Sequence, residues 1–414
     1  RACQLMEELG AGEVVGGVAD VYTKKKEPVR VPFEPEKINS LLGTDISKED
    51  MLEYLSRVEL AYDETTNEIV APTFRHDIFR TADIAEEVAR FYGYDNIPTT
   101  LPSGEATTGK LPFKLRIEEV ARDVAEYCGF SQGYCYSFES PKVFDKLQIP
   151  AGDELRKAIT ISNPLGEDFS IMRTISLNGM LTSLSTNYNR RNKDVKLFEM
   201  AKVYLPKSLP LTELPDERVQ FTLGMYGEGD FFTMKGVVEE LFDKLGMTKK
   251  VHYDPSCERP YLHPGRKADI VYEGVKLGYL GEVHPEVADN YKIGERVYVA
   301  VLDMPAVVPF VSFDWKYEGL AKYPATTRDI SMVVPKEILV GQIEDIIAQR
   351  GGKILESYKL FDIYEGEQLT RGYKSLAYKI VFRASDRTLT DDEVNKCMDK
   401  IMNGLGEKNV VLRQ

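Results

Sequence analysis

The chain has 414 residues, of which 43% are hydrophobic and 29% are charged, and its formal net charge is −13. This length predicts two to four domains, and the composition is that of an ordinary globular protein. No apolar run is long enough to cross a membrane, and no signal peptide is recognisable. The five cysteines form no CxxC pair, which is typical of a reducing cytoplasm and speaks against zinc ribbons or a disulfide framework.

The negative charge is unevenly distributed. Residues 320–414 carry 15 Lys and Arg against 14 Asp and Glu, a net charge of +1, which leaves −14 for the rest of the chain. Nucleic-acid binders normally carry a basic surface. If nucleic acid binds, we therefore expect the contact in the C-terminal part.

A small helix-plus-β domain is predicted between residues 28 and 100, after a short segment at residues 1–24. A strand near residues 29–33 precedes a helix that stops at Gly43, and Ser47 is the predicted N-cap of a second helix, with Asp50 as its third residue. Strands near residues 59–62 and 68–71 then lead into a third helix. A winged DNA-binding module could have the same order, but no basic recognition helix is visible, so we expect no DNA partner.

Acidic residues gather at the start of the third helix. Ile84, Val88 and Phe91 recur at helical spacing. The carboxylates of this segment are Asp77, Asp83, Glu86 and Glu87. The last three share one helix face, where they repel one another unless a positive group lies among them. A hard cation such as Mg²⁺ is one solution.

A structural interpretation competes with a metal site. Asp83 and Glu86 have the spacing of a capping box, in which Asp83 is the N-cap. Glu86 and Arg90 could form an i, i+4 ion pair. Judged from spacing alone, the cap and the surface ion pair are favoured over the metal.

The whole segment 75–98 reads R-x-D-I-x-x-x-x-D-I-x-E-E-V-x-R-x-x-G-Y-D-x-I-P. It resembles the signature of the bacterial phenylalanyl-tRNA synthetase β-subunit family. In that family the four matching carboxylates hold a magnesium ion at the contact with the catalytic α subunit. The resemblance therefore implies a Mg²⁺ site, shared with that subunit, at Asp77, Asp83, Glu86 and Glu87.

Residues 110–311 are predicted to form a mixed α/β domain, with amphipathic helices near 115–127 and 235–245 and a strand at 197–204. Several segments resemble the family's synthetase-like module, among them FSIMRTISLNGMLTSL, LFEMAKVY, YLHPGRKADIV and KLGYLGEVHPEV. That module is a degenerate copy of a class II aminoacyl-tRNA synthetase core, which is built on an antiparallel sheet. The fold class implied for the whole chain is thus multidomain, α/β and α+β.

The chemistry of a class II core is not expected here. Such catalysis needs an arginine close to a glutamate and a second arginine in a Gly-rich motif, which together bind the ATP phosphates. Glu199 is retained, but Leu197 stands where the arginine would be. No G-x-G-x-G-x-E-R motif and no phosphate-binding loop occurs. We therefore expect no catalytic residue and no ATP binding by this chain.

Two other groups of residues allow a functional interpretation. In LHPGR and GEVHPE, His263 could act as an acid, His284 as a base and Arg266 as an anion clamp. A turn is the better interpretation of both segments, because the residue before proline is held in an extended conformation. Arg190 and Arg191 lie in a basic loop that could contact RNA phosphates. A solvated charged turn explains that loop equally well.

Residues 320–414 are predicted to form a β-α-β-β-α-β domain. Strands are expected at 330–334, 354–363, 374–383 and 410–412, with a helix at 340–350 and another after a Thr390–Glu393 capping box. This order is that of ferredoxin-like and RRM folds, which leave one sheet face open. YPATTRDIS, KLFDIY and RASDRTLTDDEV resemble the ferredoxin-fold anticodon-binding domain that ends the family's β subunit. The candidate RNA-binding residues are Arg371, Tyr373, Lys374 and Arg383, with Arg190 and Arg191.

The resemblance implies the C-terminal portion of a β subunit of phenylalanine–tRNA ligase. Residues 1–24 would be the tail of the family's editing region, and its N-terminal tRNA-binding and editing modules would lie outside this chain. Such a chain would be the non-catalytic partner of the α subunit in a cytoplasmic α2β2 heterotetramer that uses ATP to charge tRNA(Phe), with no membrane partner. A free-standing RNA-binding or regulatory protein derived from the subunit is the alternative. A metal-dependent phosphoryl-transfer enzyme is disfavoured, because the phosphate loop and the arginines are missing.

Overall fold

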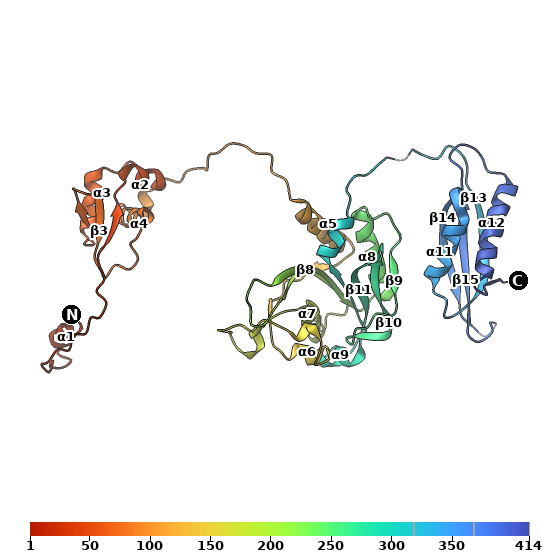
Figure 1. Ribbon diagram of the computed structural model, residues 1–414, viewed down its shortest axis with the longest axis horizontal. Coiled ribbons are helices and arrows are strands. Elements are labelled where there is room, and N and C mark those ends of the chain that lie inside the picture. The colour runs from red at the N-terminus through yellow and green to blue at the C-terminus, as the bar shows by residue number, and fades with distance from the viewer. Residues whose placement is uncertain (318, 367–368, 414) are drawn as a thin grey trace. The chain divides into compact units, whose positions relative to one another are not determined.

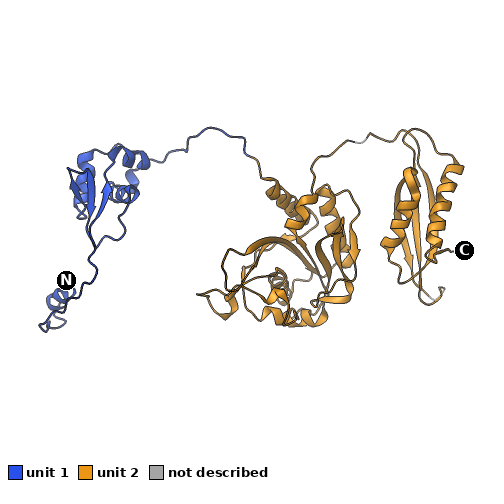
Figure 2. Ribbon diagram, in the orientation of Figure 1, with its two compact units in different colours: residues 1–109 blue, residues 110–414 orange. Residues whose placement is uncertain are grey.

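The chain divides into two compact units, unit 1 (residues 1–109) and unit 2 (residues 110–414) (Figure 2). The structure is a computed structural model that describes residues 1–317, 319–366 and 369–413 (Figure 1). Among these described residues, no helix combines the length and the apolar character needed to cross a membrane.

In residues 1–109, a three-stranded antiparallel sheet packs with three helices around one apolar core. The sheet order is β1-β3-β2, with β1 at Val29–Pro32, β2 at Ala61–Asp63 and β3 at Glu68–Ala71. The helices are α2 (Pro35–Leu42), α3 (Lys48–Ser56) and α4 (Thr81–Tyr92), while α1 (Ala2–Glu8) has no buried residue. The Ser47 side chain accepts a hydrogen bond from the N–H of Asp50, which confirms the predicted cap of α3.

Between residues 110 and 311 the central element is a seven-stranded sheet in the order β4-β7-β8-β12-β11-β10-β9 (Figure 1). All neighbouring pairs are antiparallel except β4 with β7. The strands are β4 (Ser131–Gln132), β7 (Val195–Leu205), β8 (Asp216–Tyr226), β9 (His252–Asp254), β10 (Leu262–Tyr272), β11 (Val275–Val283) and β12 (Val297–Asp303). The predicted mixed α/β character of this region is confirmed.

Both faces of this sheet are covered by apolar side chains. Along β12, Ala300 and Leu302 belong to the cluster that includes α5 and α8, whereas Val299 and Val301 belong to the cluster that includes α7. Successive strand residues point to opposite faces, so one strand contributes to two cores. The helices are α5 (Phe113–Tyr127), α6 (Val143–Lys146), α7 (Leu177–Asn189), α8 (Phe231–Lys244), α9 (Pro285–Asn290) and α10 (Met304–Val307).

Helix α8 begins four residues before its predicted start at residue 235. Asp230 is its N-cap, and its Oδ1 accepts the N–H groups of Phe232 and Thr233, each at 2.9 Å. The amphipathic pattern becomes clear only from Met234 onward, whereas the cap lies in the turn before it. The prediction from periodicity was therefore late by one helical turn.

The C-terminal domain confirms the predicted β-α-β-β-α-β order. Its antiparallel sheet has the order β14-β15-β13-β16, and the two helices pack on one face (Figure 1). The elements are β13 (Thr326–Pro335), α11 (Val340–Gly351), β14 (Leu355–Tyr364), β15 (Tyr373–Phe382), α12 (Asp391–Gly406) and β16 (Val411–Leu412). The capping box of Thr390 and Glu393 opens α12 as predicted.

A glycine sets the spacing inside the large sheet. A Cβ atom on Gly278 of β11 would lie 2.1 Å from the carbonyl oxygen of Val301 in β12. We expect Gly278→Ala to lower the free energy of unfolding by about 1–3 kcal/mol, because the backbones of the two strands must separate. Gly236→Ala, in α8 where no atom lies within 4 Å of the added Cβ, should raise it by about 0.5–1 kcal/mol. Urea denaturation of both variants checks this, and equal stability would contradict it.

Candidate functional sites

The four carboxylates predicted as metal ligands lie near the N-terminal half of α4 and in the segment before it. The N-cap of this helix is Arg80, not Asp83 as the capping-box prediction had it. Asp83 is the third helical residue, and its Oδ2 accepts the N–H groups of Phe79 and Arg80, both at 3.0 Å. Partial burial raises the pKa of Asp83, but these N–H donors and the Arg80 side chain lower it overall. The prediction was wrong because the spacing does not show where the helix begins.

The second part of that prediction, an ion pair of Glu86 with Arg90, is also wrong. Arg90 donates to Oε2 of Glu87 at 2.5 Å, and Glu86 is exposed and has no salt bridge among the described residues. Glu87 has only 7% of its surface exposed. A buried carboxylate requires a cation more strongly than an exposed one, so the arginine pairs with Glu87.

A second guanidinium lies in the centre of the cluster. Arg75 donates to both oxygens of Asp77, at 3.0 and 2.6 Å, and to Oε1 of Glu87 at 2.7 Å. The hydrogen bonds from Arg75 hold the pKa of Asp77 at about 2. Burial raises the pKa of Glu87, but hydrogen bonds from Arg90 and Arg75 lower it overall.

These contacts decide whether the cluster, as it stands, fits a magnesium ion. Asp77, Asp83 and Glu87 each already face an arginine. No group of three or more His, Cys, Asp or Glu residues within the described ranges is arranged to hold a metal ion. The arrangement therefore fits guanidinium groups and not Mg²⁺, and the four-ligand set stays a prediction.

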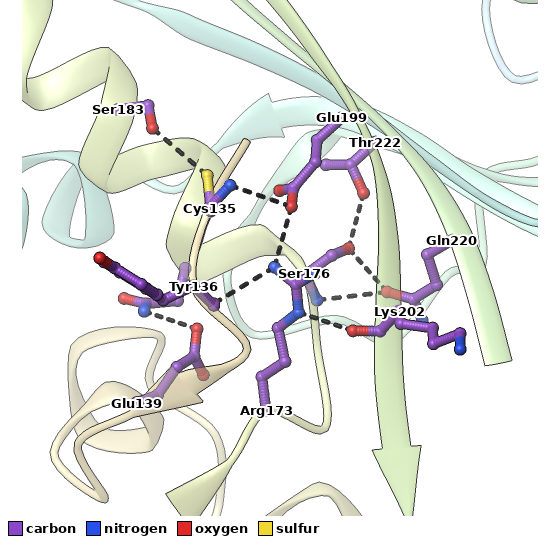
Figure 3. A network of polar contacts seen from close by, with 11 residues as sticks. Cys135, Tyr136, Glu139, Arg173, Ser176, Ser183, Glu199, Lys202, Gln220 and Thr222 are labelled. Atoms are coloured by element: carbon purple, nitrogen blue, oxygen red, sulfur yellow. Dashed lines mark hydrogen bonds and ion pairs between the residues drawn. The ribbon is translucent and has the colours of Figure 1, made fainter. Parts of the chain in front are cut away.

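In unit 2, Glu199 lies in a polar network beneath the sheet edge at β7 (Figure 3). Its Oε1 accepts a hydrogen bond from Nη1 of Arg173 at 3.1 Å and from the N–H of Cys135 at 3.2 Å. Both charged side chains are only 3% exposed. The Nε of Arg173 donates to the carbonyl of Lys202 at 2.6 Å, which fixes the guanidinium against β7.

Arg173 follows the short strand β6 (Ile171–Met172), which pairs with β5 (Phe138–Glu139). Sequence reasoning missed this residue, although a glutamate in an apolar strand signals that a buried partner must exist. Leu197 packs against the apolar cluster that includes α7. Arg173 is enclosed, and its hydrogen bonds go to Glu199 and to the carbonyls of Lys202 and Tyr136.

A cavity of about 540 Å³ lies beside this ion pair. Its lining includes Arg122, Tyr134, Tyr136 and Lys202 as well as the pair itself. Oε2 of Glu199 is buried and accepts no hydrogen bond from the described residues. The cavity is therefore lined by an acidic group whose charge is neutralised from within the chain.

The residues His263, Arg266 and His284 have structural partners. Nδ1 of His263 accepts the N–H of Gly265, and Nδ1 of His284 accepts the N–H of Glu286 at the start of α9. Arg266 contacts both carboxylate oxygens of Glu282, at 3.0 and 3.1 Å. These contacts indicate a structural role and not an acid–base pair. The predicted turn is wrong for LHPGR, because His263 and Arg266 lie within β10, at an irregularity in its pairing with β11, whereas His284 is the N-cap of α9.

The predicted RNA-binding residues divide into engaged and exposed ones. Arg383 is paired with Glu356 and donates to the carbonyl of Tyr323. Lys374 donates to the carbonyl of Lys336, and burial lowers its pKa. The exposed ones are Arg371, in the turn before β15, and Arg190 and Arg191, just after α7, while Tyr373 is half-buried.

The open face of the C-terminal sheet carries cations that the motif search did not select. Tyr378 and Ile380 of β15 are buried beneath the helices, so Lys379 between them points to the other face. Lys359 of β14 is directly opposite Lys379 in the register. We call this surface the open sheet face, and its residues are Lys359, Lys379, Tyr364 and Arg413.

An aromatic–cation contact joins residues from the two outer strands of the sheet, Tyr364 of β14 and Arg413 just after β16. The guanidinium carbon of Arg413 lies 5.3 Å from the centre of the Tyr364 ring. Neither Lys359 nor Lys379 has a salt bridge to any described residue. Cationic and aromatic side chains on one face, here the two lysines and the Arg413–Tyr364 contact, are groups with which proteins bind single-stranded nucleic acid; Asp329 of β13 lies opposite Lys379 on the same face.

Comparisons with known proteins match three families to successive parts of the chain. A family described as "tRNA synthetase B5 domain" matches residues 31–94, "Phenylalanyl tRNA synthetase beta chain CLM domain" matches residues 97–304, and "Ferredoxin-fold anticodon binding domain" matches residues 321–413. These matches define a protein of the aminoacyl-tRNA synthetase class. Within that class, the chain belongs to the phenylalanyl-tRNA synthetase β-chain family.

Individual relatives are similar over nearly the whole chain. It is 47% identical to the phenylalanine–tRNA ligase β subunit of Clostridium acetobutylicum and 46% identical to that of Clostridium tetani, over 98% of this chain and 51% of each relative. For the Moorella thermoacetica subunit the identity is 36%, over 99% of this chain and 52% of the relative. The chain thus spans about half the length of the curated relatives it matches.

Among solved structures, a pyrrolysyl-tRNA synthetase from Desulfitobacterium hafniense is similar with a TM-score of 0.38 and 15% identity, covering 47% of this chain and 68% of that chain. A likeness at this level carries no argument about the fold.

The Arg173–Glu199 pair allows a direct test of buried ion pairing. We expect Arg173→Met to lower the free energy of unfolding by about 3–5 kcal/mol, because it leaves a buried carboxylate without a cation. Adding Glu199→Met should restore part of that loss. Lys207→Met breaks the exposed pair with Glu213 and should cost less than about 1 kcal/mol. Denaturant titration measures all three, and a loss from Arg173→Met no larger than the surface control would refute the argument.

Proposed function

We propose that this chain acts as the non-catalytic β-subunit part of a phenylalanine–tRNA ligase. In this proposal it binds the anticodon arm of tRNA(Phe) and assembles with a catalytic α subunit in an α2β2 enzyme of the cytoplasm. The family membership supports this function, as do the three matched domains. The open sheet face of the domain matched as anticodon-binding is the observation that carries it.

The proposed division of labour leaves ATP chemistry to the α subunit. Residues 110–311 are proposed to be a class II synthetase-like module without catalysis, supported by the antiparallel sheet and by Leu197 at the arginine position. The internal pairing of Glu199 with Arg173 supports the same conclusion. The proposed domains are the tail of an editing region at residues 1–24, the small helix-plus-β domain at 28–100, the synthetase-like module at 110–311 and the anticodon-binding domain at 320–414.

The four acidic residues of unit 1 are proposed to contribute to the subunit contact. Glu86 is exposed without a salt bridge to a described residue, Asp77 is exposed but paired with Arg75, and Glu87 is held by two arginines. Because three of the four carboxylates are paired within the chain, a magnesium ion at this contact would require these pairs to rearrange.

The RNA contact is tested by charge removal on the open sheet face. In the assembled enzyme, Lys359→Ala with Lys379→Ala should weaken tRNA(Phe) binding about tenfold and reduce the slope of log affinity against log salt by about two. Lys396→Ala with Lys400→Ala removes the same charge from the exposed side of α12, behind the sheet, and serves as the control. Filter binding over a salt series measures both. An unchanged slope for the Lys359→Ala and Lys379→Ala variant would indicate that tRNA contacts another surface, with Arg190 and Arg191 as the next candidates.

Catalytic silence of the isolated chain is a separate expectation. Without an arginine available for the ATP phosphates, the barrier to adenylate formation is not lowered by charge stabilisation. We expect no phenylalanine-dependent exchange of pyrophosphate into ATP from this chain, and full exchange when the α subunit is added. Exchange by the chain without its partner would contradict the non-catalytic proposal.

A further inference from the structure

The cavity beside β7 contains a buried hydrogen-bond acceptor that the described residues do not use. Oε1 of Glu199 accepts hydrogen bonds from Arg173 and from the N–H of Cys135, whereas Oε2 accepts none from a described residue (Figure 3). Glu199 is 2% exposed and lines this cavity of about 540 Å³. A buried acceptor is normally paired with a donor, because leaving it unpaired costs free energy. The unused oxygen therefore marks the position of a donor group inside the cavity.

The charged residues of the lining already have partners. Each of them forms a salt bridge, and the pairs are Glu118 with Arg122, Glu199 with Arg173, and Lys202 with Glu217. A ligand of either charge would lose its hydration and meet no unpaired group of opposite charge among the described residues of the lining. An uncharged donor loses less hydration, and its hydrogen bond to a carboxylate is stronger than one to a neutral acceptor. The lining thus favours an uncharged ligand with a donor group.

Aromatic side chains form much of the remaining lining. They are Tyr134, Tyr136, Phe138 and Tyr204. Tyr134 and Tyr136 are 95% and 74% exposed, so their rings present apolar surface to water at the cavity. Aromatic rings favour other rings in offset or edge-to-face arrangements. The volume of the cavity is also within the range of small-molecule sites, and together these features indicate a ligand with an aromatic body.

We propose that this cavity binds a small, uncharged aromatic compound that donates an N–H or O–H group to Oε2 of Glu199. Arg173 is a positioning residue in this site, because it occupies Oε1, fixes the carboxylate and leaves Oε2 as the acceptor for the ligand. The inference goes beyond the proposed function, which assigns no ligand to residues 110–311. Its failure would therefore leave the proposed function unaffected.

The test uses the full chain and two pairs of probes in ligand-observed NMR titrations. Indole carries one N–H donor and no charge, and 1-methylindole has the same rings without the donor. We expect indole to bind at least about tenfold more tightly than 1-methylindole, because only indole can donate to Oε2. Benzyl alcohol and benzylamine compare an uncharged donor with a charged one at nearly equal shape. The alcohol should bind at least about tenfold more tightly, because the ammonium group loses its hydration beside a carboxylate that is already paired.

Three variants locate the binding in this cavity. Glu199→Gln can keep its carbonyl oxygen towards Arg173 while its amide nitrogen replaces Oε2, so the preference for indole over 1-methylindole should disappear. Glu282→Gln is the matched control, since it changes another buried carboxylate of the same sheet, paired with Arg266 and outside the lining, and should leave the preference unchanged. Tyr136→Ala removes an exposed ring and should weaken indole binding at least about threefold.

Each outcome decides the proposal. Equal affinity for indole and 1-methylindole overturns it, as does the absence of indole binding, because water would then be the partner of Oε2. An unchanged preference in Glu199→Gln also overturns it, and benzylamine affinity equal to or above that of benzyl alcohol overturns the uncharged class. If Glu199→Gln does not fold, Tyr136→Ala decides the location, and unchanged indole affinity in that variant places the binding outside this cavity.

Discussion

Most of the buried carboxylates among the described residues are paired with a cation of the chain itself, because a charge withdrawn from water needs a partner. Glu139 is the exception: it accepts a hydrogen bond from Asn178, and burial raises its pKa to about 7. Glu199 in the large sheet is paired with Arg173, and Glu87 in the N-terminal unit is paired with Arg75 and Arg90. An unpaired charge in such surroundings would cost several kcal/mol. The positions of these arginines therefore constrain the segments that carry them, namely the stretch before α4 and the one after β6.

This internal pairing also determines what the two acidic sites can do. Beside β7, Arg173 pairs with the carboxylate of Glu199, so the cavity next to it is lined by an acidic group that is already neutralised. In unit 1, the oxygens of Asp77 and Glu87 are likewise occupied by guanidinium groups of the chain. In both cases, binding of a further charged group has to compete with a contact inside the chain.

The C-terminal domain shows the opposite arrangement. On the open sheet face, Lys379 lies in the register between Lys359 of β14 and Asp329 of β13, and neither lysine forms a salt bridge with a described residue. The two lysines, placed directly opposite each other, repel. Such a pair is tolerated on a face exposed to water and becomes favourable when a polyanion covers it. Cations that have internal partners, such as Arg383 with Glu356, stabilise the domain and are less available to RNA.

What the sequence determined by itself was local. The order of elements in residues 320–414, the caps at Ser47 and Thr390 and the helical spacing of Ile84 and Val88 follow from patterns within a few residues, and the structure confirms them. The partners of the acids were decided only by the tertiary structure. Arg75 reaches Glu87 across 12 positions and Arg173 reaches Glu199 across 26, because a turn or another strand brings them together. Even Asp83 changed its role, from N-cap to third helical residue, because the helix begins where the preceding chain packs and not where the spacing alone would place it.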